Sequence, residues 1–298
     1  MDPIEKAVKL IKLKDINIGR HKYQELKAKL NKDGILSPDD LLKIEAYESN
    51  SKTPLSDDQK NKIVSYYKKV AQPYTGNHYL FKPDELLEKF ISEFERMEKR
   101  KFIKNDDSKN NILPLIYYFT RDERFFNCPN LISDKLNING RDKQSMPSFD
   151  KGLLIIGNFG NGKSSSMDVF HRIFSKYDNL KFGKYPANDV VEYYEGCNSP
   201  EDKRIFWERM SRAVIYFDDV KTERIASNYG KANIFKDMIE KREVRKLKTH
   251  ITCNFKPGHP DSINDALIEF AEKYGSRVFD RLFSMFNILI FTGASFRR

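Results

Sequence analysis

A glycine-rich segment that follows a short apolar run is the feature that most constrains this sequence. Residues 152–156 read Gly-Leu-Leu-Ile-Ile, and residues 157–164 read Gly-Asn-Phe-Gly-Asn-Gly-Lys-Ser. The second stretch matches the pattern G-x-x-x-x-G-K-[ST], and a stretch with apolar residues at helical spacing comes after it. This order predicts a buried strand, a phosphate-binding loop and a helix whose N-terminus faces a phosphate. A glycine-rich turn without that role would need neither the strand nor the helix.

Each position of this loop suits a triphosphate. Glycines allow the backbone to turn its N–H groups inward, where a side chain would obstruct a phosphate. Lys163 is expected to reach the β- and γ-phosphates, and the hydroxyl of Ser164 is expected to bind Mg²⁺. The sequence therefore predicts ATP and Mg²⁺ as ligands. The residues predicted to contact the nucleotide are Gly157, Asn158, Phe159, Gly160, Asn161, Gly162, Lys163, Ser164 and Ser165.

A second motif is an apolar stretch that ends in two carboxylates. Residues 212–217 read Arg-Ala-Val-Ile-Tyr-Phe and precede Asp218 and Asp219. A buried strand of this kind holds Mg²⁺ and positions water in phosphate-loop ATPases. Asp218 is expected to contact the metal through water, and Asp219 is expected to orient or deprotonate the attacking water. The alternative is an ordinary strand before an Asp-Asp turn, which the phosphate loop about 55 residues earlier disfavours.

Further polar side chains follow the later predicted strands. Residues 248–255 read as another strand, and Asn254 near its end can hydrogen-bond the γ-phosphate or the attacking water. Arg277 and Arg281 are separated by one helical turn, so they lie on the same helix face. Because a guanidinium forks onto phosphate oxygens, Arg281 and Arg297 are candidate nucleotide contacts.

The charge balance favours a polyanionic partner. The formal net charge is +10 and the isoelectric point is about 9.2, which is typical of proteins that bind nucleic acid. A basic run at residues 241–248 has two interpretations. It is either a solvated helix end or a contact with DNA or a neighbouring subunit.

Composition argues against a membrane protein and against a disulfide-stabilised one. The mean hydropathy is −0.66, and no apolar run approaches the roughly 18 residues that span a bilayer. Three cysteines, Cys128, Cys197 and Cys253, are too far apart for a disulfide framework or a zinc knuckle. We therefore expect no membrane contact and a cytoplasmic location.

Two regions are predicted from the pattern of elements. Residues 1–105 read as helices, among them 21–30 and an amphipathic helix from Pro83. They are predicted to form a helical N-terminal partner-binding region, and a helical extension that only packs on the rest of the chain is the alternative. Residues 104–111 are polar and are the predicted linker. Residues 112–126 carry apolar residues at mixed spacing and lead into a loop that is expected to reach residue 150. The ATPase domain is predicted at 106–298. Its alternating strands and helices indicate an α/β fold with a mainly parallel sheet.

With these residues in view, the chain resembles AAA+ ATPases of the DnaC-type helicase loader group, which is related to DnaA-like initiators and IstB-like transposition ATPases. The stretches that carry the resemblance are Gly157–Ser164, Ile215–Asp219, Thr249–Asn254, Tyr274–Leu282 and Ser295–Arg297.

The resemblance implies roles for single residues. Asn254 would be sensor 1, Arg297 sensor 2, and Arg281 the arginine finger offered to the next subunit, with Arg277 as the competing candidate. Arg242 would have a secondary intersubunit role. The site would therefore be completed by self-association. Many relatives carry Glu where Asp219 stands, so slow, assembly-dependent hydrolysis is expected.

The function implied is that of an ATP-dependent DNA replication factor in a bacterial or phage-infected cell. It would act on a replicative DNA helicase and on single-stranded DNA. Two alternatives stay open: an IstB-like transposition ATPase, and a nucleotide-dependent DNA-binding scaffold that does not hydrolyse ATP. The N-terminal region contains no family motif, so helicase binding there is inferred from position alone.

Overall fold

The computed structural model describes residues 20–33, 44, 81–228 and 230–295, and the chain divides into units at 1–78 and 79–298. In the first unit, α2 (Arg20–Asp33) confirms the helix predicted at 21–30. Its Leu26 packs with Ile44 and Tyr23. The other residues before 81 lie outside the described part of the chain.

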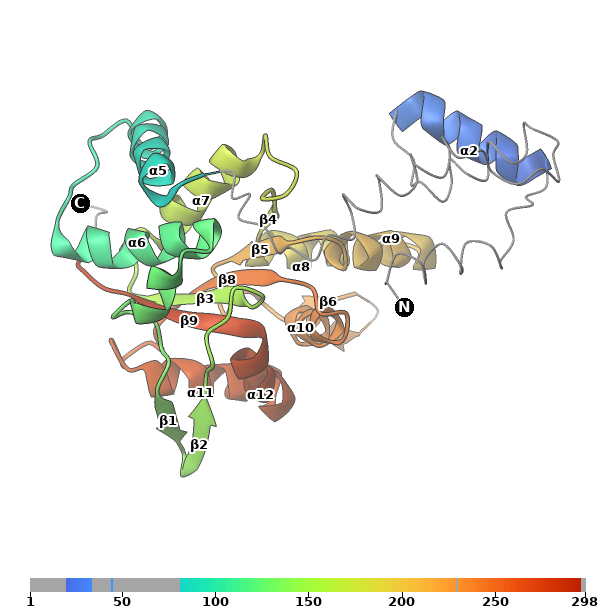
Figure 1. Ribbon diagram of the computed structural model, residues 1–298. Helices are drawn as coiled ribbons and strands as arrows, with labels where there is room; N and C mark the ends of the chain where they lie inside the picture. Colours follow the sequence, from blue (N-terminus) through green and yellow to red (C-terminus); the bar gives the residue numbers. More distant parts are fainter. Residues whose placement is uncertain (1–19, 34–43, 45–80, 229, 296–298) are drawn as a thin grey trace, which may run out of the picture. The chain divides into compact units, whose positions relative to one another are not determined.

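A five-stranded parallel sheet forms the centre of the second unit (Figure 1), which confirms the predicted fold class. The spatial order is β4-β5-β8-β3-β9, so the strand before the phosphate loop lies between β8 and β9. Every residue of β3 and β8 is buried, as expected for strands covered on both faces. The strands are β3 (Gly152–Gly157), β4 (Gly183–Pro186), β5 (Ile215–Asp218), β8 (Thr249–Asn254) and β9 (Phe286–Phe291).

Helices cover both faces of this sheet. Side chains alternate along β3, so Leu153 and Ile155 face one hydrophobic core while Leu154 and Ile156 face another. The first core includes α5 (Pro83–Glu98), α6 (Asp106–Thr120) and α7 (Lys163–Phe174). The second core is formed by α8 (Ala187–Glu195), α9 (Pro200–Met210), α10 (Ile234–Val244), α11 (Ile263–Tyr274) and α12 (Ser276–Met285). Among the helices described, none is both long and apolar enough to cross a membrane.

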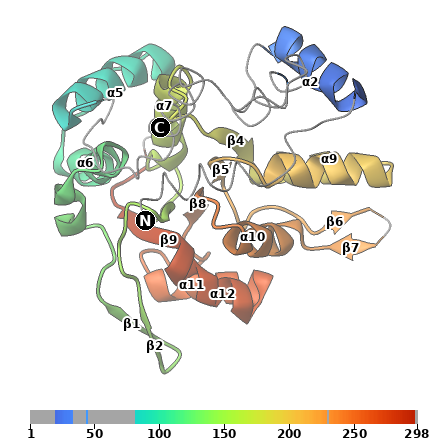
Figure 2. The ribbon, with the colours of Figure 1, turned by 45° about the vertical axis from the view of Figure 1, so that its right-hand side comes forward.

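Helix α5 packs within the second unit, ahead of the boundary predicted at residue 105. Its apolar stripe includes Leu86, Phe90 and Phe94, and the Phe90 ring lies 5.0 Å from that of Phe170 on α7. Figure 2 shows α5 and α7 side by side. The amphipathic pattern of α5 is therefore explained by burial against α7.

The linker predicted at 104–111 is wrong, because α6 begins inside it. Asn105 caps this helix and forms a reciprocal capping box with Ser108. Asn111 is buried and its side chain donates to the Thr292 carbonyl over 2.9 Å. The polar residues that suggested a linker thus serve as a helix cap and as a tie to the end of β9.

The loop expected before residue 150 contains a short helix and a hairpin. The 3₁₀ helix η1 (Glu123–Asn127) follows α6, and strands β1 (Lys135–Ile138) and β2 (Arg141–Gln144) pair antiparallel. Their turn is Asn139–Gly140, with φ of 51° and 74°. An Asn-Gly pair between strands is a strong hairpin signal, so the sequence did contain this element. A second small hairpin joins β6 (Ala226–Ser227) to β7 (Lys231–Ala232).

Candidate nucleotide site

The phosphate loop connects the end of β3 to the start of α7. Gly160 and Gly162 have φ of 75° and 93°, a region that favours glycine. Gly157 is needed for a different reason. A Cβ atom there would clash with Asn161 and come within 2.7 Å of the Phe291 carbonyl oxygen. The glycines therefore fix the loop conformation that the motif predicts.

Lys163 is the first residue of α7, and its side chain is buried inside the loop. Its ammonium donates to the carbonyl oxygens of Gly157 and Asn158, at 2.9 and 2.7 Å. It also donates to the side-chain oxygens of Asn161 and Asn254, at 3.2 and 3.0 Å. Because Gly157 pairs with Asn254 in the sheet register, these contacts hold the ammonium at the carboxyl edge of β3 and β8.

Asp218 at the end of β5 lies beside the hydroxyl of Ser164. One carboxylate oxygen accepts hydrogen bonds from Ser164 (2.7 Å), Tyr216 (2.5 Å) and Thr252 (2.5 Å). Burial, followed by the nearby Asp218 charge, holds the pKa of Tyr216 well above its usual value, so this phenol remains a neutral donor. The carboxylate is thereby oriented from three sides.

The Ser164–Asp218 pair suits Mg²⁺. This ion prefers hard oxygen ligands, and it is usually bound by one or two carboxylates together with substrate phosphates and water. The pair supplies a hydroxyl and a carboxylate next to a loop shaped for phosphate. Within the described residues there is no cluster of three or more His, Cys, Asp or Glu side chains that could hold a metal alone. The site therefore fits a metal that arrives with a triphosphate.

Asp219 and Asn254 complete a hydrogen-bonded chain across two strands. The amide nitrogen of Asn254 donates to Asp219 Oδ1 over 2.8 Å, while its oxygen accepts from Lys163. Asp219 has φ of 56°, and its backbone N–H donates to Thr252 Oγ1 over 3.0 Å. This left-handed conformation, uncommon for residues other than glycine, turns the chain at the end of β5. Asn254 thus links the predicted phosphate-binding lysine to the predicted water-positioning carboxylate.

These residues face one cavity of about 260 Å³. The cavity brings together most of the predicted contacts, whereas Gly157 and Asn161 support the loop and Asn158 hydrogen-bonds Asp261 at the surface. Two lining residues, Glu98 and Arg100, were not predicted. They lie at the end of α5 and directly after it, outside the nucleotide motifs. The lining residues are Glu98, Arg100, Phe159, Gly160, Gly162, Lys163, Ser164, Ser165, Asp218, Asp219 and Asn254.

The arginines assigned from the family resemblance have different environments. Arg281 on α12 forms ion pairs with Glu240 and Glu243 of α10, at 3.2 and 3.3 Å. Arg277, one turn earlier, is exposed, and no residue in the described part of the chain pairs with it. Neither lines the cavity of its own chain. Arg297 lies outside the described residues.

The intersubunit role suggested for Arg242 is wrong. Its side chain is fully buried, so a neighbouring subunit cannot reach it. The guanidinium donates to Thr249 Oγ1 (2.8 Å) and to the carbonyl oxygens of Met210 (2.7 Å), Ala213 (3.0 Å) and Lys248 (2.9 Å). Arg242 therefore ties α10 to the amino ends of β5 and β8.

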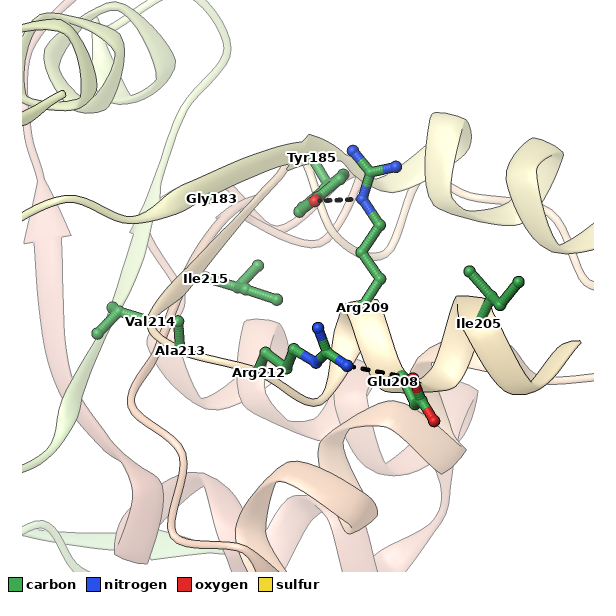
Figure 3. A pocket seen from close by; sticks show the side chains of 9 residues that line it. All are labelled: Gly183, Tyr185, Ile205, Glu208, Arg209, Arg212, Ala213, Val214 and Ile215. Carbon is green, nitrogen blue, oxygen red and sulfur yellow. Dashed lines mark hydrogen bonds and ion pairs between the residues drawn. The ribbon is translucent and has the colours of Figure 1, made fainter. Parts of the chain in front are cut away.

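A second pocket, of about 420 Å³, lies at the edge of the sheet between β4 and α9 (Figure 3). The Arg209 guanidinium donates to the Tyr185 hydroxyl over 2.9 Å and lies 5.6 Å from the rings of Tyr185 and Tyr193. Arg212 reaches Glu208 at 3.1 Å. This pocket contains none of the motif residues, so it is separate from the phosphate loop.

The described residues define a phosphate-loop α/β fold with polar side chains gathered at the carboxyl edge of its sheet. Two solved structures are similar to it. The crystal structure of the DnaC helicase loader has 16% sequence identity, covers 64% of this chain and 94% of that chain, and has a TM-score of 0.44. The crystal structure of DnaI has 15% identity, covers 64% and 88%, and has a TM-score of 0.41. No protein-family model matches the chain, and no curated protein matches it significantly. These likenesses concern the fold alone.

Proposed function

We propose that this protein is an ATP-dependent DNA replication factor of the helicase-loader type, which binds ATP with Mg²⁺ and hydrolyses it slowly. The observation that carries the proposal is the hydrogen-bonded chain Lys163–Asn254–Asp219 beside the Ser164–Asp218 pair. All five side chains face one cavity at the carboxyl edge of the sheet. A phosphate-binding cation, a metal-binding pair and a water-positioning acid are the groups that ATP hydrolysis needs.

The chemistry follows from these positions. Lys163 exchanges its carbonyl acceptors for oxygens of the β- and γ-phosphates. Ser164 and Asp218 would hold the Mg²⁺, which would supply positive charge against the charge that develops on the transferred phosphoryl group. Asp219 orients the attacking water and accepts its proton, and the Asn254 amide fixes the Asp219 carboxylate. Asp219 is one methylene shorter than Glu, which is consistent with slow turnover.

Phosphate release tests the hydrolytic part of the proposal. Asp219→Asn is expected to lose about 100-fold in turnover, because general base catalysis contributes at least that much, while Mg·ATP affinity stays within a few-fold of wild type. Asp237→Asn, on an exposed part of α10, is the matched control and keeps wild-type turnover. Wild-type protein that binds ATP but releases no phosphate, with or without single-stranded DNA, would be the non-hydrolysing scaffold instead.

We propose further that a neighbouring copy completes the site with an arginine from α12. Arg277 is the better of the two candidates, because it is exposed and available, whereas Arg281 would have to leave two carboxylates of its own chain. Mixing variants tests this. Arg277→Ala and Lys163→Ala are each expected to be inactive alone, and a mixture is expected to regain activity at interfaces that pair an intact Lys163 with an intact Arg277. Loss of activity in Arg281→Ala but not in Arg277→Ala would assign the role to Arg281.

Single-stranded DNA is the proposed polyanionic partner, and the face formed by β4 and α9 is the proposed contact. Figure 3 shows Arg209 and Arg212 at one pocket with Tyr185. Cations beside aromatic rings are how single strands are bound without sequence preference. Replacing both arginines with Gln is expected to weaken oligothymidine binding about tenfold and to reduce its salt dependence, with ATP affinity unchanged. Equal affinity at all salt concentrations would exclude this face.

The choice of a replicative helicase as partner follows the resemblance of the motif stretches. Because the apolar face of α5 is buried against α7, we place helicase binding on residues 1–78. The proposed place of action is the cytoplasm. Co-purification with the cell's replicative helicase, and its loss on deleting residues 1–78, would support the loader. Co-purification with a transposase instead would identify the IstB-like alternative.

A further inference from the structure

The end of α5 reaches the mouth of the nucleotide cavity. The helix ends at Glu98, and Lys99 with φ of 53° turns the chain so that Arg100 follows. Glu98 and Arg100 both line the cavity that contains Lys163 and Asp218. The wall of this cavity is therefore built partly by a segment about 60 residues before the phosphate loop, which no nucleotide motif marks.

This segment is anchored by its own contacts. The backbone N–H of Phe102 donates to Glu95 Oε1 over 3.0 Å. The Phe102 ring packs edge-on against Phe90 and Phe94, with centroids 5.8 and 5.3 Å apart. Arg100 lies between the end of α5 and this anchor, so its backbone position is defined by both sides. The guanidinium has a fixed base from which to reach into the cavity.

Glu98 and Arg100 form an ion pair at the mouth of the cavity. Arg100 Nη2 lies 3.6 Å from Glu98 Oε2, and the side chains are 41% and 31% exposed. The Arg100 guanidinium also lies 5.6 Å from the centre of the Phe94 ring. A partly exposed ion pair of this kind contributes little, whereas a guanidinium binds phosphate oxygens by two parallel hydrogen bonds. A triphosphate in the cavity would therefore offer Arg100 stronger acceptors than the Glu98 carboxylate does.

We propose that Arg100 is a second cationic ligand of the triphosphate, and that Glu98 opposes nucleotide binding by pairing with Arg100 and repelling the phosphates. This inference rests on the proposed nucleotide site and deepens it. When a triphosphate is bound, Arg100 leaves Glu98 and ties residues 99–105 to the phosphate loop. The state of the nucleotide is thereby transmitted to α5, the helix that connects the ATPase unit to residues 1–78 in the chain.

Equilibrium binding of nucleotides to the full chain tests this assignment. Arg100→Ala is expected to weaken Mg·ATP binding about tenfold, and Arg100→Lys is expected to restore part of the loss, because a lysine keeps the charge without the fork. Glu98→Gln is expected to strengthen binding two- to threefold, since it removes a competing carboxylate. Lys101→Ala is the matched control, an exposed neighbouring cation outside this cavity, and stays within twofold of wild type.

The phosphate assignment predicts a dependence on the nucleotide. The loss in Arg100→Ala should be largest for ATP, smaller for ADP and least for AMP. An equal loss for all three would move the contact to the base or ribose and overturn the proposal. Hydrogen exchange adds a structural readout, because ATP should protect the amides of residues 99–105 in wild type and not in Arg100→Ala.

Three variants separate the role of Arg100 from the existence of the nucleotide site. If Lys163→Ala loses ATP binding while Arg100→Ala and Glu98→Gln bind like wild type, Arg100 is not a ligand and the site stands. If Lys163→Ala binds ATP like wild type, the nucleotide site is wrong. Thermal unfolding shows whether Arg100→Ala folds. The gain in ATP affinity expected for Glu98→Gln tests the proposal even if Arg100→Ala does not fold.

Discussion

Lys163 and Arg242 are two buried cations at opposite ends of strand β8. Arg242 donates to Thr249, the first residue of the strand, and Lys163 donates to Asn254, the last. Both also donate to backbone carbonyl oxygens. They differ in what surrounds them. Arg242 is enclosed by protein, whereas Lys163 faces a cavity with three carboxylates in its wall.

The space around a buried charge decides whether the charge has a structural role or a binding role. A cation that is enclosed by protein and donates to fixed backbone and side-chain oxygens holds helices and strands together. A cation with similar acceptors next to an open cavity can exchange them for a ligand. The comparison therefore predicts that Arg242 acts on stability, that Lys163 acts on binding, and that the two effects separate.

The largest effect is expected at Arg242. Arg242→Met leaves the Thr249 hydroxyl and three buried or partly buried carbonyl oxygens without this donor, which should lower the free energy of unfolding by about 4 kcal/mol. Urea unfolding measures it, with Arg245→Met on the same basic run as the exposed control, expected within about 0.5 kcal/mol of wild type. At temperatures where Arg242→Met is folded, its ATP affinity should be unchanged. An Arg242→Met variant as stable as wild type would contradict the structural role of Arg242.

A buried residue of β8 itself, His250, is expected to make stability depend on pH. Its Nδ1 accepts the Leu153 N–H over 3.2 Å, and burial, aided by the charges of Lys248 and Arg242, lowers the pKa of His250 to about 3. The unfolded chain has a pKa near 6.5 at this residue. The stabilising effect of the neutral ring is therefore complete above about pH 6.5 and is lost as the pH falls toward 3.

The measurement compares wild type with His250→Gln, which cannot titrate. Between about pH 6 and pH 4 the unfolding free energy of wild type should fall by about 1.4 kcal/mol per pH unit more than that of the variant. Other titrating groups cancel in this difference. Equal slopes would show that His250 is not held neutral.

The smallest effect is expected at Arg281. Its ion pairs with Glu240 and Glu243 join α12 to α10, but the side chain is 24% exposed. Arg281→Ala should therefore cost only about 1 kcal/mol of unfolding free energy, and Arg277→Ala should cost less than about 0.5 kcal/mol. Chemical denaturation of both variants checks this. A larger loss for Arg277 would show that it holds the fold and is not available to a neighbour.

Much of the site could be predicted because its chemistry is carried by local patterns. The phosphate loop needs glycine at fixed spacing, and a parallel sheet places the ends of β3, β5 and β8 at one edge, so Lys163, Asp218 and Asn254 had to lie close together. Arg100 was missed because it reaches the cavity through helix packing, which leaves no local pattern. Arg242 was misread because a basic run looks the same in sequence whether its members are solvated or buried.

The fold was predicted least well where polar residues have structural roles. Asn105, Ser108 and Asn111 gave the composition of a linker, yet they cap α6 and bind the backbone after β9. The β1–β2 hairpin was missed although Asn139 and Gly140 form its turn, because its strands alternate too weakly between apolar and polar residues to be recognised.

Equilibrium binding of Mg·ATP to wild type and to Lys163→Ala shows whether Lys163 belongs to a triphosphate site. Wild type should bind, and Lys163→Ala should lose at least about 100-fold in affinity, or roughly 3 kcal/mol, because a charge-assisted contact to two phosphates is removed. The unfolding free energy of the variant should be within about 1 kcal/mol of wild type, in contrast to Arg242→Met. Equal affinity of the two proteins for Mg·ATP would show that Lys163 does not hold a triphosphate.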